Sequence, residues 1–184
     1  MEFIDYKELI ERRISRDFVL DETSSYEARK YDVVATRTKE EAMSFGENVL
    51  NREVMLVSFN VTKDYVLDEI DSIPNILLSG FRSISKNKSS VLTRVFVMEN
   101  IPFDLIQTVR SYSFSRTENR QFKSYVEAGV ILVDANNFSF YSNSTAASKY
   151  SYFRVINPVE TADADEEKKR SSLNFSLRMI LLCA

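Results

Sequence analysis

Histidine and tryptophan are absent from this 184-residue sequence, and cysteine occurs once, as Cys183. Without histidine the chain cannot form a Ser-His-Asp or Cys-His catalytic pair or a histidine-bearing zinc site. A single cysteine cannot form an intrachain disulfide, which is typical of proteins in a reducing cytoplasm. Any catalysis would therefore depend on carboxylates, hydroxyls, arginine or lysine.

Glycine is also scarce, and its three positions are Gly46, Gly80 and Gly129. Neither a Walker A loop nor a Gly-rich dinucleotide fingerprint can be written with so few. No apolar run approaches the roughly 20 residues that span a bilayer. The first five residues include two acids and lack the basic region and apolar core of a signal peptide. We therefore expect a cytoplasmic protein without membrane association.

The charge balance is slightly acidic, with a net charge of -3 and a pI of about 5.2. Such a balance gives no general attraction to DNA or RNA, so nucleic acid is a poor candidate partner. Hydrophobic residues make up 44% and charged residues 28%, which is ordinary for a globular domain. We expect one domain with a helical part over 1–52, a strand-rich core over 53–158, and a charged connector and apolar element over 159–184.

Helical signals dominate the N-terminal part. Residues 2–16 place their apolar side chains on one face of a helix, with Tyr6 and Ile10 at its centre. Ser24 is followed three residues later by Glu27, which is the spacing of a capping box. Residues 38 and 41 repeat this spacing and predict a further helix that ends near Asn51.

Strand signals dominate the rest. β-branched and apolar residues predict strands over 54–61, 91–98 and 130–133. Thr62 predicts the cap of a helix over 63–72 that Pro74 ends, after which residues 76–78 form a strand that enters a turn at Gly80. Residues 103–109 form a short strand or a turn of helix, and 138–141 pairs with 152–156 as a hairpin. Helices first and strands afterwards favour an α+β fold with a largely antiparallel or mixed sheet rather than alternating βαβ units.

Two stretches are candidate functional elements, and a third lies near Glu127. The first is Gly80-Phe81-Arg82-Ser83-Ile84-Ser85, where glycine permits positive φ and serine can bond a backbone donor, as it can in any strand-to-turn junction. The second is a predicted polar loop over 111–125, and loops of that length are usually functional or mobile. Its aromatic and charged residues suit a substrate or partner, or single-stranded nucleic acid, or simply pin the loop to the core. The candidate residues are Tyr112, Phe114, Arg116, Glu118, Arg120 and Phe122.

The order of motifs over 54–156 resembles the mono-ADP-ribosyltransferases of the arginine–serine–glutamate class, including those of tailed phages. That family has a strand with an arginine, then a Gly-Phe-x-Ser-x-Ser turn, then Glu-x-Glu followed by an apolar strand. The stretch at Gly80 matches the serine motif, and Tyr125-Val126-Glu127-Ala128-Gly129-Val130-Ile131-Leu132 stands where the glutamate motif belongs.

This resemblance implies a two-sheet core around a cleft, with NAD as a candidate cofactor and no metal. It makes Glu127 the catalytic carboxylate, since a carboxylate near the nicotinamide ribose stabilises a cation-like transition state. The implied cofactor-binding residues are Gly80, Phe81, Arg82, Ser83 and Ser85.

The catalytic positions depart from the family pattern. Val57 or Ser58 occupies the place of the arginine, and Arg52 lies too early unless the strand is shifted. Glu127 matches the first glutamate of the motif, and Gly129 stands where the catalytic second glutamate belongs, unless the alignment slips by two residues.

Three hypotheses stay open. The first is a diverged or inactive relative, encoded by a phage, that acts on or binds a host protein or a nucleotide in host takeover or counter-defence. The second is an active NAD-dependent transferase that modifies a host protein. The third is an unrelated α+β binding module. Nothing in the residues indicates the oligomeric state.

Overall fold

The chain divides into two compact units, Met1–Phe153 and Arg154–Ala184. The computed structural model describes residues 3–42, 48–82, 88–117 and 125–154, so all but the first residue of the second unit lies outside the described residues. Helices and a multi-stranded mixed sheet build the first unit. The predicted α+β class is confirmed.

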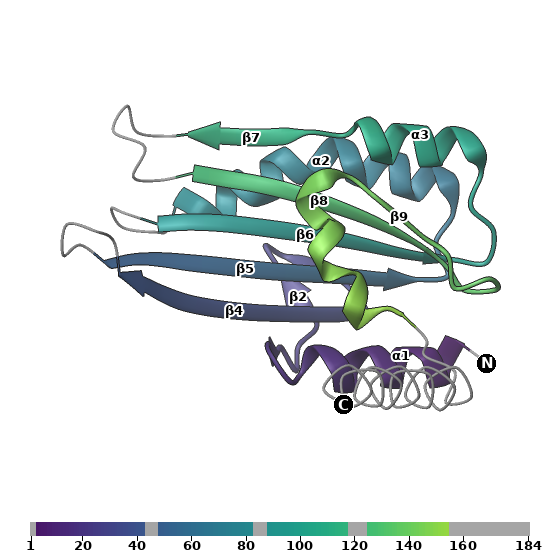
Figure 1. The fold of residues 1–184 in the computed structure, drawn as a ribbon, viewed down its shortest axis with the longest axis horizontal. Helices are drawn as coiled ribbons and strands as arrows, with labels where there is room; N and C mark the ends of the chain where they lie inside the picture. Colours follow the sequence, from purple (N-terminus) through teal and green to yellow (C-terminus); the bar gives the residue numbers. More distant parts are fainter. Residues whose placement is uncertain (1–2, 43–47, 83–87, 118–124, 155–184) are drawn as a thin grey trace, which may run out of the picture. The chain divides into compact units, whose positions relative to one another are not determined.

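Seven strands form one sheet (Figure 1). The order along its main path is β1-β4-β5-β6-β8-β7, and β9 also pairs with β8. β5, β6 and β8 run parallel to one another, and the other pairs are antiparallel. The strands are β1 (Val19–Leu20), β4 (Val33–Ala42), β5 (Asn48–Phe59), β6 (Lys88–Met98), β7 (Phe114–Thr117), β8 (Tyr125–Asp134) and β9 (Phe140–Ser142). A separate two-stranded ribbon consists of β2 (Ser25–Tyr26) and β3 (Arg29–Lys30).

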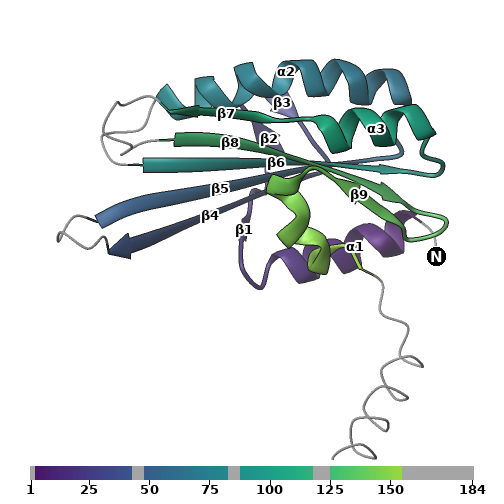
Figure 2. The same ribbon diagram turned by 45° about the horizontal axis from the view of Figure 1, so that its top comes forward.

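Helices lie on both faces of the large sheet (Figures 1 and 2). α2 (Lys63–Arg82) connects β5 to β6, and α3 (Phe103–Ser111) follows β6. Both pack on one face, here named the α2 face. α1 (Phe3–Ile14) and the 3-10 helix η1 (Ser144–Tyr152) lie on the opposite face, here named the η1 face.

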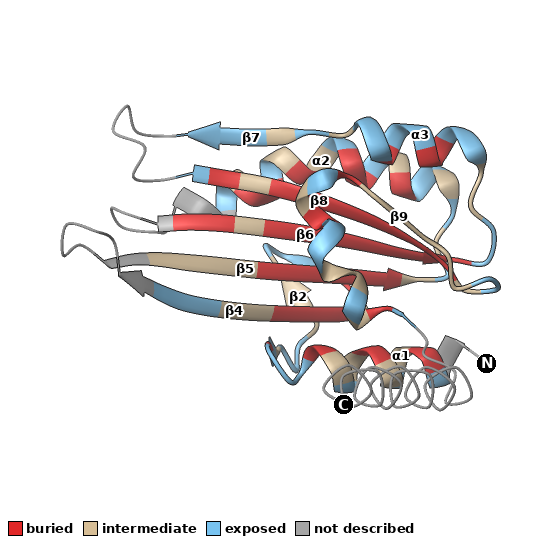
Figure 3. Ribbon diagram, in the orientation of Figure 1, coloured by how far each residue is buried: buried red, intermediate tan, exposed pale blue. Residues whose placement is uncertain are grey.

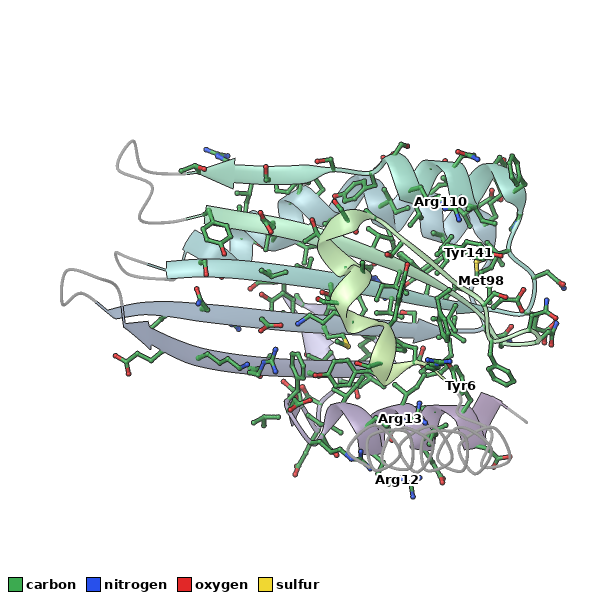
Figure 4. The ribbon with its side chains drawn as sticks, viewed as in Figure 1. Tyr6, Arg12, Arg13, Met98, Arg110 and Tyr141 are labelled. Atoms are coloured by element: carbon green, nitrogen blue, oxygen red, sulfur yellow. The ribbon has the colours of Figure 1, made fainter. Side chains whose placement is uncertain are left out.

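The main core lies between the α2 face and its two helices. Apolar side chains from α2, α3 and the central strands form one buried cluster that includes Val66, Ile73, Leu105, Leu92 and Val130. Burying each such side chain contributes about 1.5–3 kcal/mol. On the η1 face, Tyr6 lies between α1 and the strands while Arg12 points away from the sheet (Figure 4).

The N-terminal part departs from its predicted structure. The first helix forms as expected, and Tyr6, Ile10 and Ile14 are buried along one side of it. The two predicted helices with capping-box spacing were wrong, because residues 25–30 form the ribbon and 33–42 form β4. Pairing with β5 over ten residues supplies β4 with backbone hydrogen bonds that a helix would otherwise provide.

The predicted strand over 76–78 and the turn at Gly80 were wrong as well. α2 begins at the predicted residue, with the Thr62 hydroxyl oxygen accepting a hydrogen bond from the Tyr65 N–H at 3.3 Å, but it continues through Pro74 to Arg82. Proline removes one donor inside the helix. Burial of Ile73, Ile76 and Leu77 against the sheet offsets that loss.

The connections also differ from expectation. Two parallel crossovers, from β5 through α2 to β6 and from β6 through α3 to β8, replace the expected segregation of helices and strands. β7 occupies part of the predicted loop over 111–125. The hairpin predicted over 138–156 was wrong, since Tyr152 ends η1 and β9 pairs with β8. Within the described residues there is one large sheet with a small ribbon, rather than two sheets facing each other.

Candidate functional site

Among the described residues, one half of the η1 face is partly open to solvent, more so toward its two edges than at β6, where Ser89 is buried. Along β8, Tyr125 is 41% exposed and Glu127 is half-buried, while Val126 and Ala128 on the α2 face are buried. From Gly129 onward every residue of β8 is buried. Figure 3 shows the same change along β4 and β5. Residues 36–40 and 50–53, in the half of the sheet that contains Tyr125, are intermediate or exposed, and this half is named the outer half. η1 therefore covers only the inner half of this face.

Strand pairing arranges the open half into two rows of side chains. Paired residues in neighbouring strands share a face, and residues two apart in one strand share it too. The inner row contains Arg37, Glu53, Val91, Glu127 and Ser115, and the outer row contains Lys39, Asn51, Ser89, Tyr125 and Thr117. These ten residues are named the polar platform. Nine of them are charged or can form side-chain hydrogen bonds, so this face is suited to a hydrophilic ligand.

A shallow hollow of about 300 Å³ lies at the β7–β8 end of the platform. Its lining consists of Ser115, Thr117, Tyr125 and Glu127. An aromatic ring, a carboxylate and two hydroxyls therefore converge on one small surface site. This set can accept and donate hydrogen bonds and can stack against a flat ring, but it contains a single carboxylate.

A cluster of charges lies at the β4–β5 end of the platform. Arg37 donates to one oxygen of Glu53 at 2.5 Å, and Lys149 of η1 donates to the other. Phe18 lies under both cations, 4.5 Å from the Arg37 guanidinium and 5.6 Å from the Lys149 ammonium. Burial raises the pKa of Glu53, but the hydrogen bonds and charges of Lys149 and Arg37 outweigh it and hold the pKa below its ordinary value. The cluster ties η1 to the sheet.

The boundary between the covered and open halves is Gly129. A Cβ atom at this position would lie 2.8 Å from the Cβ of Ala146 in η1, which is too close for two real side chains. Glycine in a strand often marks such a close approach. η1 therefore leaves no room for a side chain at Gly129.

A second charged group lies on the α2 face, around the fully buried Arg94 of β6. Its Nε donates to Glu69 at 3.0 Å, and its two other nitrogens donate to the Leu56 and Val95 carbonyls, the Ser58 hydroxyl and the Tyr65 hydroxyl. All five N–H groups of the guanidinium thus have acceptors. Arg94 therefore lies beside Ser58, although it belongs to the neighbouring strand. Its hydrogen bonds connect β5, β6 and α2, and no N–H group remains to bind a phosphate.

The predicted cofactor-binding stretch and Glu127 are not brought together. Gly80, Phe81 and Arg82 form the last turn of α2, whose body packs on the α2 face, whereas Glu127 faces the opposite side of the sheet. Ser83 and Ser85 lie outside the described residues.

The predicted partner loop is partly a strand. Tyr112 caps the C-terminus of α3, and Phe114 packs against the main core. Arg116 in β7 is exposed and lies on the face opposite to Ser115 and Glu127. Glu118, Arg120 and Phe122 lie outside the described residues.

Sequence reasoning missed the platform and the Arg94 group. A signal for the latter exists, because Arg94 directly precedes the apolar run 95–98 and Glu69 lies between the apolar residues Leu67 and Ile70 of α2. The platform has only a weak signal, in the polar residues that alternate with apolar ones at the start of β8.

No three His, Cys, Asp or Glu side chains gather as metal ligands within residues 3–42, 48–82, 88–117 and 125–154. In the same parts of the chain, no helix has the length and apolar character needed to cross a bilayer. Comparison of the sequence and fold with protein-family models, curated proteins and solved structures finds no match.

Proposed function

We propose that this chain is a non-catalytic binding domain that holds a ribose-bearing nucleotide, such as NAD or ADP-ribose, at the hollow of the polar platform. The observation that carries the proposal is that Glu127 lines the same hollow as the ring of Tyr125 and two hydroxyls. A carboxylate accepts hydrogen bonds from ribose hydroxyls, as in dinucleotide-binding folds. An exposed aromatic ring stacks on a base without regard to its identity.

Binding without cleavage is supported by the surroundings of Gly129. Cleavage at the nicotinamide ribose requires a carboxylate beside the developing cation. Ala146 fills the space next to Gly129, where the resembled family has its catalytic glutamate. On this proposal the protein acts in the cytoplasm as a diverged relative that recognises a nucleotide instead of transferring ADP-ribose.

Calorimetric titration of the full chain with ADP-ribose and with NAD tests the proposal. We expect binding of both by the unaltered protein. Glu127→Gln and Tyr125→Ala should each weaken it about tenfold or more, which corresponds to roughly 1.4 kcal/mol. Glu99→Gln and Phe103→Ala are matched controls, because both residues are exposed and lie at the other end of the sheet. They should leave affinity unchanged.

Three results would contradict the proposal. The unaltered protein could bind neither nucleotide, or Glu127→Gln could bind as tightly as the unaltered protein. The third is release of nicotinamide from NAD, which would instead indicate an active transferase. Circular dichroism of every variant shows whether a loss of binding reflects a loss of fold.

Binding of a host protein is a second candidate, favoured by the edge of the sheet. Among the described residues β7 is the last strand on its side, and Ser115, Arg116 and Thr117 are exposed. A strand edge of this kind can pair with an extended segment of a partner. Ser115→Pro should then abolish capture of a defined partner while Phe103→Ala retains it, and equal capture by both variants would dismiss this candidate.

A further inference from the structure

Charge is distributed unevenly across the polar platform. At its β4–β5 end, Arg37 and Lys149 both contact Glu53, Lys39 lies in the outer row, and a second carboxylate, Asp17, accepts a hydrogen bond from Tyr152 close by. At its β7–β8 end, Glu127 is the sole charged member of the platform. Among the described side chains, the β4–β5 end therefore has one cation more than it has carboxylates, whereas the β7–β8 end has a carboxylate alone.

The arginines of β5, β6 and β7 do not alter this polarity. Arg52 of β5, Arg94 of β6 and Arg116 of β7 alternate with platform residues, so they lie on the α2 face. Arg94 is fully buried and all its donors are used. These arginines thus leave the middle of the platform neutral, where the buried Ser89 donates its hydroxyl to Asn51.

The two ends differ in how they can meet a ligand. Arg37 and Lys149 have side chains that are mostly covered and already hold Glu53, so they supply a positive field rather than direct contact. Lys39 is exposed in the outer row, next to Asn51. Its long flexible side chain carries three donors and can reach an anion on the platform.

The separation of the ends suits one class of ligand. Three strand spacings separate β8 from β4, which amounts to about 14 Å. A ligand that satisfies both ends has hydroxyls or a flat ring at Glu127 and Tyr125, and an anionic group on the side of Lys39. A nucleoside diphosphate or ADP-ribose in an extended form has these groups in that order.

We infer that the β4–β5 end of the polar platform is a phosphate subsite, and that the ligand lies across the strands from Glu127 to Lys39. The inference rests on the proposed function and adds to it the anionic character and the direction of the ligand. It also assigns Lys39 a role in specificity, since this residue separates phosphorylated from unphosphorylated ligands.

The test compares adenosine, ADP and ADP-ribose as calorimetric probes of the full chain. We expect the two phosphorylated probes to bind more tightly than adenosine and to weaken with added salt. Lys39→Glu should lower the affinity for ADP-ribose about tenfold, the size of one lost charge-assisted contact, and leave that for adenosine within about twofold. Lys30→Glu makes the same charge change at an exposed site on the ribbon and should alter neither.

The failure of this inference differs from the failure of the proposed function. If all three probes bind equally and Lys39→Glu has no effect on affinity, the proposed phosphate subsite is refuted, whereas binding of the ribose at Glu127 is still supported. If the unaltered protein binds none of them, the proposed function is wrong and the subsite falls with it. Tighter binding of a short single-stranded oligonucleotide than of ADP-ribose would also overturn the inference and make nucleic acid the ligand.

Discussion

Ala146 of η1 packs directly against the backbone of Gly129 in β8, so closely that a Cβ at Gly129 would lie 2.8 Å from the Cβ of Ala146. The backbone nitrogen and Cα of Ala146 would both lie 3.3 Å from the same atom. Along β8 this contact sets the edge of the polar platform, because every residue from Gly129 onward is buried whereas Tyr125 and Glu127 before it are not. Nearby, Asn143 secures the start of η1 by accepting a hydrogen bond from the Val130 N–H at 3.0 Å.

Gly129→Ala should destabilise the fold by about 1–3 kcal/mol, since the added methyl overpacks the contact with η1. Ala146→Gly removes the opposing methyl, so the double variant should regain part of this loss. Urea unfolding of the four proteins forms a double-mutant cycle. Additive effects of the two substitutions would show that the contact is not as close as described.

Glu69→Ala should cost about 3–5 kcal/mol, because it leaves the charge of the fully buried Arg94 without its carboxylate. Arg29→Ala removes the other partner of Glu69, but Arg29 is 44% exposed and its pair is worth less than about 1 kcal/mol. Urea unfolding measures both. Similar losses for the two variants would mean that Arg94 is not desolvated.

Tyr6→Phe and Tyr112→Phe should have different effects on stability although each removes one hydroxyl. The Tyr6 hydroxyl donates to the Phe153 carbonyl at 2.6 Å in a buried site, so its loss should cost about 1–2 kcal/mol. The Tyr112 hydroxyl is buried without a hydrogen-bond partner among the described residues, so its removal should be neutral or stabilising. Thermal unfolding of both variants checks this.

These two tyrosines should also ionise late. Burial raises the pKa of Tyr6, and burial together with the negative charge of Asp71 raises the pKa of Tyr112 to about 12. A raised pKa in the folded state means that stability is complete below the ordinary value of 10.0 and falls as pH rises toward 12. A tyrosinate absorbance titration in which all tyrosines ionise near pH 10 before unfolding would contradict this.

Ala28→Gly should stabilise the protein by up to about 1 kcal/mol. Glu27 and Ala28 form the two-residue turn between β2 and β3 with φ of 49° and 63°, a region that costs residues with a Cβ about 1–2 kcal/mol. Glycine avoids this cost but loses more entropy on folding. Ala147→Gly in η1, also exposed but outside the positive-φ region, should destabilise, and a loss of stability in both variants would contradict the turn geometry.

Acid should weaken the attachment of η1 to the sheet through Glu53. Its pKa in the folded state is below the ordinary 4.5, so its stabilising contribution is complete above that pH and is lost as pH falls through the lower folded value. Lys149→Met should therefore reduce the loss of stability on acidification below about pH 4.5. Lys7→Met, which removes a surface pair with Glu11, should leave the pH profile unchanged. Urea midpoints measured between pH 6 and 3 test both variants.

Local patterns predicted the elements whose partners lie close in the chain. The spacing of Tyr6, Ile10 and Ile14 predicts α1 because a helix repeats every 3.6 residues whatever lies beside it. Thr62 predicts the start of α2 for the same reason, since a cap acts on the next turn. The β-branched runs predict the centres of β5 and β6.

The same patterns failed where distant pairing decides the structure. The spacing of Thr38 and Glu41 occurs in strands as well as in helices. Both residues belong to β4 because they pair with residues of β5, which lie further along the chain. Pro74 predicts a helix end, yet α2 continues to Arg82 because the residues after Pro74 are buried against the sheet. Misplacing that helix produced the predicted turn at Gly80 and the expectation of a strand before it.

Composition and local spacing settle which chemistries this chain lacks, where several elements begin, and that Glu127 precedes an apolar strand. They do not settle which side chains share a face. Strand order and register place Glu127 beside Ser115 and in one row with Glu53 and Arg37, and they leave Gly80 on the far side of the sheet. Register depends on residues far apart in the chain, and a shift of one residue exchanges the two faces of a strand. The polar platform is therefore a property of the tertiary structure alone.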